Sequence, residues 1–352
     1  MSKFFSPAHS SLTAYTPGEQ PQDKKYIKLN TNESPYPPAK EVIDAINREE
    51  VSNLRLYSDP ECRELCASIA NYLNVEKENI ILGNGSDEIL SFLFLAYSFG
   101  NCGVAFPSIS YGFYKVFAAL YGIEAQQIGL NDNFEIDYKD YLGLNKTIVI
   151  ANPNAPTGIF MPLWQIEEIL KSNADNIVII DEAYVDFGGE SAVSLLPVYK
   201  NLVVTRTFSK SRSLAGARLG FAVADKEIIR DLNTIRNSLN PYNINRLTLL
   251  AGKASIENSD YFEEMCSKII STRNKLTADL EEIGFTILPS SANFIFAKHC
   301  EYKGEYLYKA LKEKGVLVRH FSGDRISDFM RITIGTDEEC NVLVEMLKEI
   351  MR

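Results

Sequence analysis

Short apolar runs rich in β-branched residues alternate along the middle of the chain with longer amphipathic stretches. Such runs are typical of buried strands, and the stretches between them have the period of helices. This alternation predicts parallel strands joined by helical crossovers, with ligands bound beyond the carboxyl ends of the strands. The expected strands are residues 79–82, 103–106, 147–151, 176–180, 202–205 and 219–223, and the expected helices are 61–73, 87–96, 111–120 and 163–171.

The pattern changes after residue 245. A long helical stretch at 261–282 is followed by short strands at 285–288, 294–297, 317–319 and 330–334 and by a closing helix at 337–351. With 352 residues the chain also exceeds the usual size of a single hydrophobic core. We therefore expect an arm at 1–40 that packs with the small domain, a large α/β domain at 41–250, and a small α+β domain at 251–352.

Charge and composition exclude several classes of partner. Asp and Glu outnumber Lys and Arg by 46 to 36, so the chain has no broad positive field for nucleic acid. No apolar run approaches the roughly 20 residues that cross a bilayer, and the N-terminus lacks the apolar core of a secretory signal. The six cysteines are scattered, with no CxxC pair and only three histidines, which disfavours disulfides and metal sites. We expect a cytosolic protein that binds no nucleic acid, membrane or metal.

The most informative segment is TRTFSKSRSLAGARLGF, residues 205–221, which follows an expected strand. Lys210 stands between two serines, and Arg218 comes eight positions later, which suits an amine placed beside a phosphate site. A lysine whose charged form is disfavoured by nearby cations supplies the neutral amine that attacks a carbonyl. Lys210 is therefore a candidate for an imine with a carbonyl cofactor, although a lysine after a strand is more often a solvated surface residue.

A second segment, NIVIIDEAYVDF at 176–187, places Asp181 directly after four apolar residues. A carboxylate at the end of a buried strand must find a cation or hydrogen-bond donors. A protonated pyridine nitrogen would meet that need, and Tyr184 is close enough along the chain to reach the phenolate oxygen of the same ring. The alternative is that Asp181 caps the next helix and Tyr184 packs in the core.

Residues 151–160, ANPNAPTGIF, form a Pro-rich turn after another expected strand. An X-Pro bond in such a turn is sometimes cis, and the rigid backbone presents an amide side chain with little freedom. The ordinary alternative is a Pro-rich turn without a further role.

In LGNGSDEIL, residues 82–90, glycines lead into an expected helix. The backbone N–H groups of Gly85, Ser86 and Asp87 at a helix N-terminus suit a phosphate dianion, although a plain helix start is commoner. Further along, Tyr111 in SYGFY is able to lie flat on a planar ring, or simply to pack in the core.

In this order the segments resemble the fold-type I aminotransferases that use pyridoxal 5′-phosphate, over almost the whole chain. The resemblance implies an α/β fold with a large domain, whose central sheet is mostly parallel and flanked by helices, and a smaller α+β domain. It implies that Lys210 holds the cofactor, that Asp181 pairs with its ring nitrogen and that Tyr184 contacts its ring oxygen. The implied phosphate ligands are Gly85, Ser86, Ser209 and Arg218, the ring-stacking residue is Tyr111, and the residue for the substrate carboxylate is Arg331.

The chain departs from the family at one position. The family usually has Asn immediately before Pro-Thr-Gly, whereas this chain has Ala155 there and Asn154 one position earlier. We assign the amide that contacts the ring oxygen to Asn154.

The ends of the chain resemble one group within that family, the histidinol-phosphate aminotransferases. The matching segments are LTAYTPGEQP (12–21), KLNTNESPYPP (28–38), LYSD (56–59), VRHF (318–321) and RISDFMRITIGTDEE (325–339). This resemblance implies a homodimer in which Tyr57 crosses to the partner's cofactor phosphate. It also implies that Tyr15 lines the substrate site and that Arg319 with Arg331 binds the anionic ends of the substrates, since a guanidinium serves phosphate and carboxylate alike. Surface ion pairs are the alternative for the two arginines.

The implied reaction transfers the amino group of L-histidinol phosphate to 2-oxoglutarate and gives imidazole acetol phosphate and glutamate, as in histidine biosynthesis. Threonine-phosphate decarboxylases and aromatic-amino-acid aminotransferases are the alternatives of the same fold, and YTPGEQP with VRHF favours histidinol phosphate over both. A non-catalytic regulator that binds the cofactor is a different class. It would need an added DNA-binding domain, for which the chain has neither the length nor a basic patch.

Overall fold

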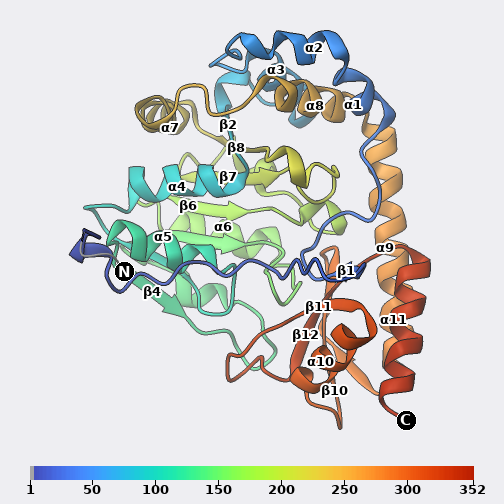
Figure 1. Ribbon diagram of the computed structural model, residues 1–352. Coiled ribbons are helices and arrows are strands. Elements are labelled where there is room, and N and C mark those ends of the chain that lie inside the picture. The colour runs from blue at the N-terminus through green and yellow to red at the C-terminus, as the bar shows by residue number, and fades with distance from the viewer. Residues whose placement is uncertain (1–3) are drawn as a thin grey trace.

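The computed structural model describes residues 4–352, which form two sheets with helices around them (Figure 1). The larger sheet has the strand order β2-β8-β7-β6-β5-β3-β4, and the smaller has the order β1-β11-β12-β10-β9. This is the expected α/β architecture with a second, smaller α+β part. The boundaries at residues 40 and 250 stay predictions.

The larger sheet is mostly parallel, as expected. The strand β8 runs antiparallel to both of its neighbours, β7 and β2, whereas the pairs from β7 to β4 are parallel. The edge strand β4 was not expected, because three of its four residues are exposed and it has no apolar run. The strands are β2 (Ile80–Gly83), β3 (Val104–Pro107), β4 (Ala125–Ile128), β5 (Thr147–Ala151), β6 (Val178–Asp181), β7 (Leu202–Thr207) and β8 (Gly220–Ala224).

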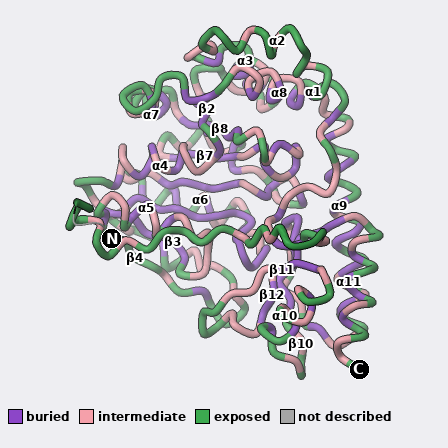
Figure 2. The backbone as a smooth tube through the Cα atoms, in the orientation of Figure 1, coloured by how far each residue is buried: buried purple, intermediate pink, exposed green. Residues whose placement is uncertain are grey.

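Helices cover both faces of this sheet, which explains why its central strands read as unbroken apolar runs. In β6, Val178 and Ile180 pack into one cluster with α3, α6 and α8, and Ile179 packs into another with α4, α5 and α7. Figure 2 shows the strands buried inside the exposed outer helices. The helices are α1 (Lys40–Ala45), α2 (Arg48–Ser52), α3 (Arg63–Leu73), α4 (Ser86–Tyr97), α5 (Phe113–Tyr121), α6 (Leu163–Ser172), α7 (Lys226–Leu239) and α8 (Arg246–Glu257).

The smaller sheet has its own core, built with three helices and one strand of the N-terminal arm. The arm passes beside α5, where His9 bonds the carbonyl of Leu120, and reaches β1, which pairs in parallel with β11 (Figure 1). The strands are β1 (Ile27–Leu29), β9 (Phe285–Ile287), β10 (Phe294–His299), β11 (Val316–His320) and β12 (Phe329–Thr333), and the helices are α9 (Ser259–Glu281), α10 (Gly304–Lys314) and α11 (Asp337–Ile350). Among residues 4–352, no helix combines the length and the apolar character that spanning a bilayer requires.

Candidate active site

A cavity of about 390 Å³ opens where β5, β6 and β7 end. Its wall includes Ala151, Asp181 and Thr207 at those strand ends, and Thr31 and Glu33 from the arm. The cavity therefore lies at the carboxyl ends of parallel strands, where the sequence predicts a ligand. The predicted site residues that line it are Ser86, Asp87, Tyr111, Asp181, Tyr184, Ser209, Lys210 and Arg218.

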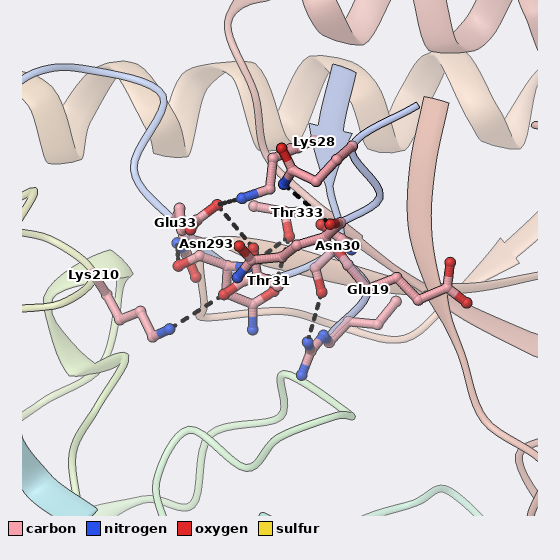
Figure 3. Close-up of polar contacts among 12 residues, drawn as sticks. Glu19, Lys28, Asn30, Thr31, Glu33, Lys210, Asn293 and Thr333 are labelled. Carbon is pink, nitrogen blue, oxygen red and sulfur yellow. Dashed lines mark hydrogen bonds and ion pairs between the residues drawn. The ribbon is translucent and has the colours of Figure 1, made fainter. Parts of the chain in front are cut away.

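Lys210 lies in the loop that follows β7 and is partly buried. Its Nζ donates to the backbone carbonyl of Thr31, 3.3 Å away on the arm (Figure 3). Burial, followed by the positive charge of Arg331, lowers the pKa of Lys210 to about 8. Lys210 is thus not a solvated surface lysine, and a large share of its amine is neutral at mildly alkaline pH.

Asp181 is the last residue of β6 and is 4% exposed. Its carboxylate accepts hydrogen bonds from the hydroxyls of Tyr114 at 2.8 Å and Thr205 at 3.1 Å. Burial raises the pKa of Asp181 to about 6, against the smaller effect of these hydrogen bonds. Both hydroxyl donors are neutral, so this buried carboxylate fits a ligand that brings its own positive charge, such as a protonated pyridine nitrogen.

Tyr184 lies between the cavity and the small domain. Its phenol oxygen accepts a hydrogen bond from Nδ2 of Asn32 at 3.0 Å, and its ring meets that of Phe294 edge-on at 5.0 Å between centroids. Burial raises its pKa, so the phenol is protonated and is a hydrogen-bond donor toward the cavity at neutral pH.

The start of α4 and Arg218 form a cradle that requires glycine at two positions. Gly85 precedes α4 with a φ of +81°, and a Cβ on it would lie 2.7 Å from Nη2 of Arg218. A Cβ on Gly220 would lie 2.4 Å from the backbone nitrogen of Ser86. The first N–H groups of α4 and the guanidinium of Arg218 are thereby brought together, and this set of donors fits a phosphate dianion.

Asp87 organises the groups around this cradle. Its carboxylate pairs with Arg218 at 3.1 Å and accepts a hydrogen bond from the hydroxyl of Tyr111 at 2.8 Å. The Tyr111 ring lies next to that of Tyr15, with 6.2 Å between the centroids, and Tyr15 stacks on Phe113 at 4.3 Å. These aromatic rings form one side of the site, toward the two arginines of the small domain.

Arg319 on β11 and Arg331 on β12 face each other directly across the antiparallel strand pair. Their side chains lie on the same face, and each guanidinium is 5.7 Å from the centre of the Phe321 ring. Arg319 donates to the carbonyls of Thr16 and Pro17, and Arg331 donates to the carbonyl of Asn30 at 3.1 Å. These partners are backbone groups of the arm, so the two arginines are not engaged as surface ion pairs.

Two like charges directly opposite each other destabilise a sheet. Nε of Arg331 is moreover buried with no hydrogen-bond partner in the described structure. Both observations are explained if an anion binds between the arginines, because it would supply the missing acceptor and neutralise the paired charges. The positive charges of both arginines also act on the hydroxyl of Tyr15, which places that side chain at the same site.

Six predicted residues are not in the wall of this cavity. Gly85, Tyr15, Arg319 and Arg331 belong to the cradle and the arginine site described above, and the other two are Asn154 and Tyr57. Asn154 is 1% exposed, and it lies in a turn whose two X-Pro bonds are cis. Its amide bonds Thr157 of the same turn and, in the loop after β3, the hydroxyl of Ser110 and the carbonyl of Ile109. The residues of this motif that line the cavity are Ala151, at the strand end, and Ala155. Tyr57 is 81% exposed and stacks on Tyr242 at 4.5 Å.

The side chains at the site that were not expected from the sequence include three that hold predicted residues by hydrogen bonds. Tyr114 and Thr205 hold Asp181, and Asn32 holds Tyr184. In the sequence, Tyr114 looks like one more apolar residue of an amphipathic helix. A buried tyrosine hydroxyl ordinarily has a hydrogen-bond partner, and this rule was the one indication that Tyr114 bonds a polar group. Asn32 stands in a segment that matched the family without any one residue indicating a role.

A sequence model of the class I and II aminotransferases matches residues 24–347. A histidinol-phosphate aminotransferase of Brachyspira hyodysenteriae is 49% identical over 353 residues, covering 100% of both chains. One of Clostridium beijerinckii is 47% identical over 351 residues, covering 100% of this chain and 98% of that protein. The fold matches the crystal structure of the Sinorhizobium meliloti histidinol-phosphate aminotransferase in complex with pyridoxal 5′-phosphate, with a TM-score of 0.89, 24% identity, and coverage of 100% of this chain and 98% of that one. The chain therefore belongs to the class I and II aminotransferase family.

Proposed function

We propose that this protein is a pyridoxal-phosphate-dependent aminotransferase that moves the amino group of L-histidinol phosphate to 2-oxoglutarate, a step of histidine biosynthesis. The observation that carries the substrate assignment is the opposed pair Arg319 and Arg331, which together suit a phosphate or a carboxylate. The relatives that are 47–49% identical over the whole chain carry the same activity in their names.

The site residues fit pyridoxal phosphate at each of its ends. The α4 cradle with Ser209 and Arg218 would hold the phosphate, Asp181 would keep the ring nitrogen protonated, and Tyr184 would donate to the ring oxygen. When bound, the cofactor supplies the electron sink for a carbanion. Lys210, whose amine is partly neutral near pH 8, would take the proton from the amine-bearing carbon of the substrate and return it after the charge has moved.

The arginine pair would explain how one site accepts two different substrates. Histidinol phosphate brings a phosphate, whereas glutamate brings carboxylates, and a guanidinium fork binds either. Tyr15, stacked on Phe113, would then cover the substrate from the side of the arm. Arg319 donates once from each terminal nitrogen to carbonyls of the arm, so its remaining N–H groups could bind the anion while the arm stays in place.

We also infer a homodimer that works in the cytosol. Large apolar side chains, including Leu54, Leu56 and Tyr57, are 49–81% exposed in the segment before α3, as expected of a surface that a second copy covers. Tyr57 is exposed and is not in the wall of the cavity of its own chain, which leaves it available for the partner's cofactor phosphate. All six cysteines are free thiols, as a reducing compartment favours.

The arginine pair is tested by Arg319→Ala and Arg331→Ala. We expect Arg319→Ala to lower kcat/KM for histidinol phosphate by roughly ten- to a hundred-fold, with little loss toward phenylalanine, because one charge-assisted bond to phosphate is removed. Arg331→Ala should impair every substrate, including glutamate, because it binds the anion that they share. Steady-state kinetics with the three amino donors measure both effects.

Arg325→Ala is a matched control, since Arg325 also donates to two backbone carbonyls, those of Leu130 and Asn131, away from the arginine pair. It should change no selectivity. Equal losses of phenylalanine and histidinol phosphate in Arg319→Ala would contradict the assignment, because Arg319 would then serve only to hold the arm.

The shared site is tested by mixing inactive subunits. Lys210→Ala and Tyr57→Phe homodimers should each be strongly impaired. After dissociation and random reassociation, half of the dimers are mixed, and each mixed dimer has one intact site, so activity should recover to about a quarter of wild type. Mixing Lys210→Ala with a Lys210→Ala/Tyr57→Phe double variant should recover none. Failure of the first mixture to recover any activity would show that Tyr57 does not serve the partner's site.

A further inference from the structure

We propose that Asn32, on the N-terminal arm, is the positioning residue that directs the hydroxyl of Tyr184 at the cofactor's ring oxygen, and that it does so from an anchor on β12. This inference rests on the proposed function, because it concerns how Tyr184 meets pyridoxal phosphate. The family's amide contacts the ring oxygen directly from the residue before Pro-Thr-Gly, where this chain has Ala155, whereas the amide of Asn32 would act on that oxygen through Tyr184.

Every polar group of Asn32 has a partner. Its Nδ2 donates to the Tyr184 oxygen at 3.0 Å, its Oδ1 accepts from the hydroxyl of Thr333 at 2.9 Å, and its backbone N–H donates to that hydroxyl at 3.0 Å. Its carbonyl accepts from Nδ2 of Asn293 at 3.1 Å. Asn32 is 1% exposed, so these bonds are made out of contact with water and hold the side chain firmly.

The direction of the amide follows from the chemistry of Thr333. Its hydroxyl oxygen accepts the Asn32 backbone N–H, so the hydroxyl hydrogen is donated to an acceptor, and the acceptor is Oδ1. Oδ1 therefore faces β12 and Nδ2 faces Tyr184. The φ of Asn32 is +55°, in the left-handed region that asparagine tolerates better than most residues, which suits this residue type to the position.

The bond from Asn32 fixes the direction in which the hydroxyl of Tyr184 donates its hydrogen. A phenol has one hydrogen to donate, and its oxygen can also accept. Because the oxygen accepts the N–H of Asn32 from the side of the arm, the single hydrogen is left for an acceptor on the cavity side. Without Asn32 the hydroxyl is free to rotate and to donate elsewhere, and the ring oxygen of the cofactor loses a fixed donor.

The segment that contains Asn32 also contacts two cationic side chains of the site, Lys210 and Arg331. The carbonyl of Thr31 accepts a hydrogen bond from Lys210 (Figure 3). The carbonyl of Asn30 accepts one from Arg331, so Asn30, Thr31 and Asn32 contact the substrate arginine, the amine and the phenol in turn. Thr333 is two residues from Arg331 on β12. Asn32 thus connects β12, which carries the substrate-binding Arg331, to Tyr184, which would donate a hydrogen bond to the cofactor's ring oxygen.

The test uses the protein loaded with pyridoxal phosphate, without substrate, and follows the pH at which its visible absorption band changes. A donor at the ring oxygen stabilises the oxygen's anionic form, so Asn32→Ala should raise the midpoint by about one pH unit. Thr333→Val should move it in the same direction by less, and Thr333→Ser, which keeps the hydroxyl, should leave it near the wild-type value. Asn30→Ala is the matched control, because Asn30 is a buried asparagine of the same segment whose Nδ2 bonds Glu19 rather than Tyr184. It should cause no shift.

A double-mutant cycle with Tyr184→Phe separates positioning from a general loss of structure. If Asn32 acts through Tyr184, Asn32→Ala should add no further shift in the Tyr184→Phe background. An unchanged midpoint in Asn32→Ala, or an equal shift in both backgrounds, would overturn the proposal. If Asn32→Ala does not fold, the Thr333→Val and Thr333→Ser pair decides by the same two criteria.

The wild-type protein distinguishes this failure from a failure of the proposed function. A wild type that binds pyridoxal phosphate and turns over histidinol phosphate, together with Asn32 variants that leave the midpoint in place, would remove only the role of Asn32. A wild type that develops no visible band with pyridoxal phosphate would remove the proposed function and this inference with it.

Discussion

Replacing Lys210 by alanine is expected to lower kcat for amino-group transfer by at least about 10⁴-fold, the upper range for loss of one general base. The loss should be this large because the proposed role of Lys210 combines attachment of the cofactor with movement of the substrate proton. Lys210→Arg should be nearly as inactive, since it keeps the positive charge but cannot become neutral in this pH range. Steady-state turnover of histidinol phosphate and 2-oxoglutarate measures both losses.

Lys226, on the opposite end of the large sheet, is the matched control. It pairs with Glu76 and lies outside the cavity, so Lys226→Ala should keep wild-type turnover. Borohydride reduction of the loaded protein followed by peptide mapping should place the label on Lys210. A label on another lysine would contradict the assignment, whatever the activity of the Lys210 variants.

The pKa of Lys210 gives this prediction a pH dependence. Burial and Arg331 lower it to about 8 from 10.5, so in protein without cofactor the amine should react with an acylating reagent at a rate that levels off above pH 8. An ordinary lysine would still be gaining reactivity at pH 10. In Arg331→Ala the midpoint should move upward, because the charge that opposes protonation has been removed.

Strands with two buried faces could be predicted from the sequence, because each contains a run of at least three apolar residues. Thr147–Ala151, for example, has the bounds expected. The edge strand Ala125–Ile128 and the arm strand Ile27–Leu29 could not, since they are short, and most of their residues are not buried. Their positions depend on pairing with strands distant in sequence, which no local pattern records. The antiparallel direction of β8 was likewise not visible, because a buried strand has the same composition in either direction.

The polar residues of the cavity also divide into those that the sequence indicates and those that only the fold brings to the site. Asp181 could be predicted as a cavity residue because it directly follows an apolar run, and Tyr184 because it comes a few residues later. Lys210 stood out through its two flanking serines and Arg218, in the segment after an expected strand. Asn32 contacts Tyr184 across 152 positions of sequence, and its role follows from that contact alone. Asn154 was assigned by its distance from a motif, but its amide donates to Thr157 of the same turn and to the carbonyl of Ile109 in the loop after β3, a contact that no local pattern indicates.

The Asp181→Asn variant is expected to lose turnover by about 10²- to 10³-fold, as when one electrostatic group of an active site is removed. An amide carries no negative charge, so it cannot keep the cofactor's ring nitrogen protonated when the electrons of the carbanion arrive. The variant should still bind pyridoxal phosphate, because the phosphate cradle and Lys210 are unchanged. Single-turnover kinetics with histidinol phosphate measure the loss, and near-normal turnover would show that Asp181 has only a structural role.

The same substitution should stabilise the protein without cofactor. The pKa of Asp181 is raised to about 6 from 3.8, so the folded state binds more protons than the unfolded state between these values. The contribution to stability is therefore present below pH 3.8 and is lost as the pH rises through 6, where the buried carboxylate becomes charged. At pH 7.5 the cofactor-free Asn variant should be more stable to urea than cofactor-free wild type, by on the order of 3 kcal/mol, and the difference should vanish below pH 4.

Adding pyridoxal phosphate should reverse that order, because it gives the wild-type carboxylate a cation and gives the amide none. The reversal separates two accounts of Asp181. If the carboxylate were held mainly by Tyr114 and Thr205, as part of the fold, its removal would destabilise the protein with or without cofactor. A carboxylate that destabilises the protein until a cationic ring arrives is instead a binding group whose unfavourable burial is offset by its ligand, and only that account predicts opposite signs for the two measurements.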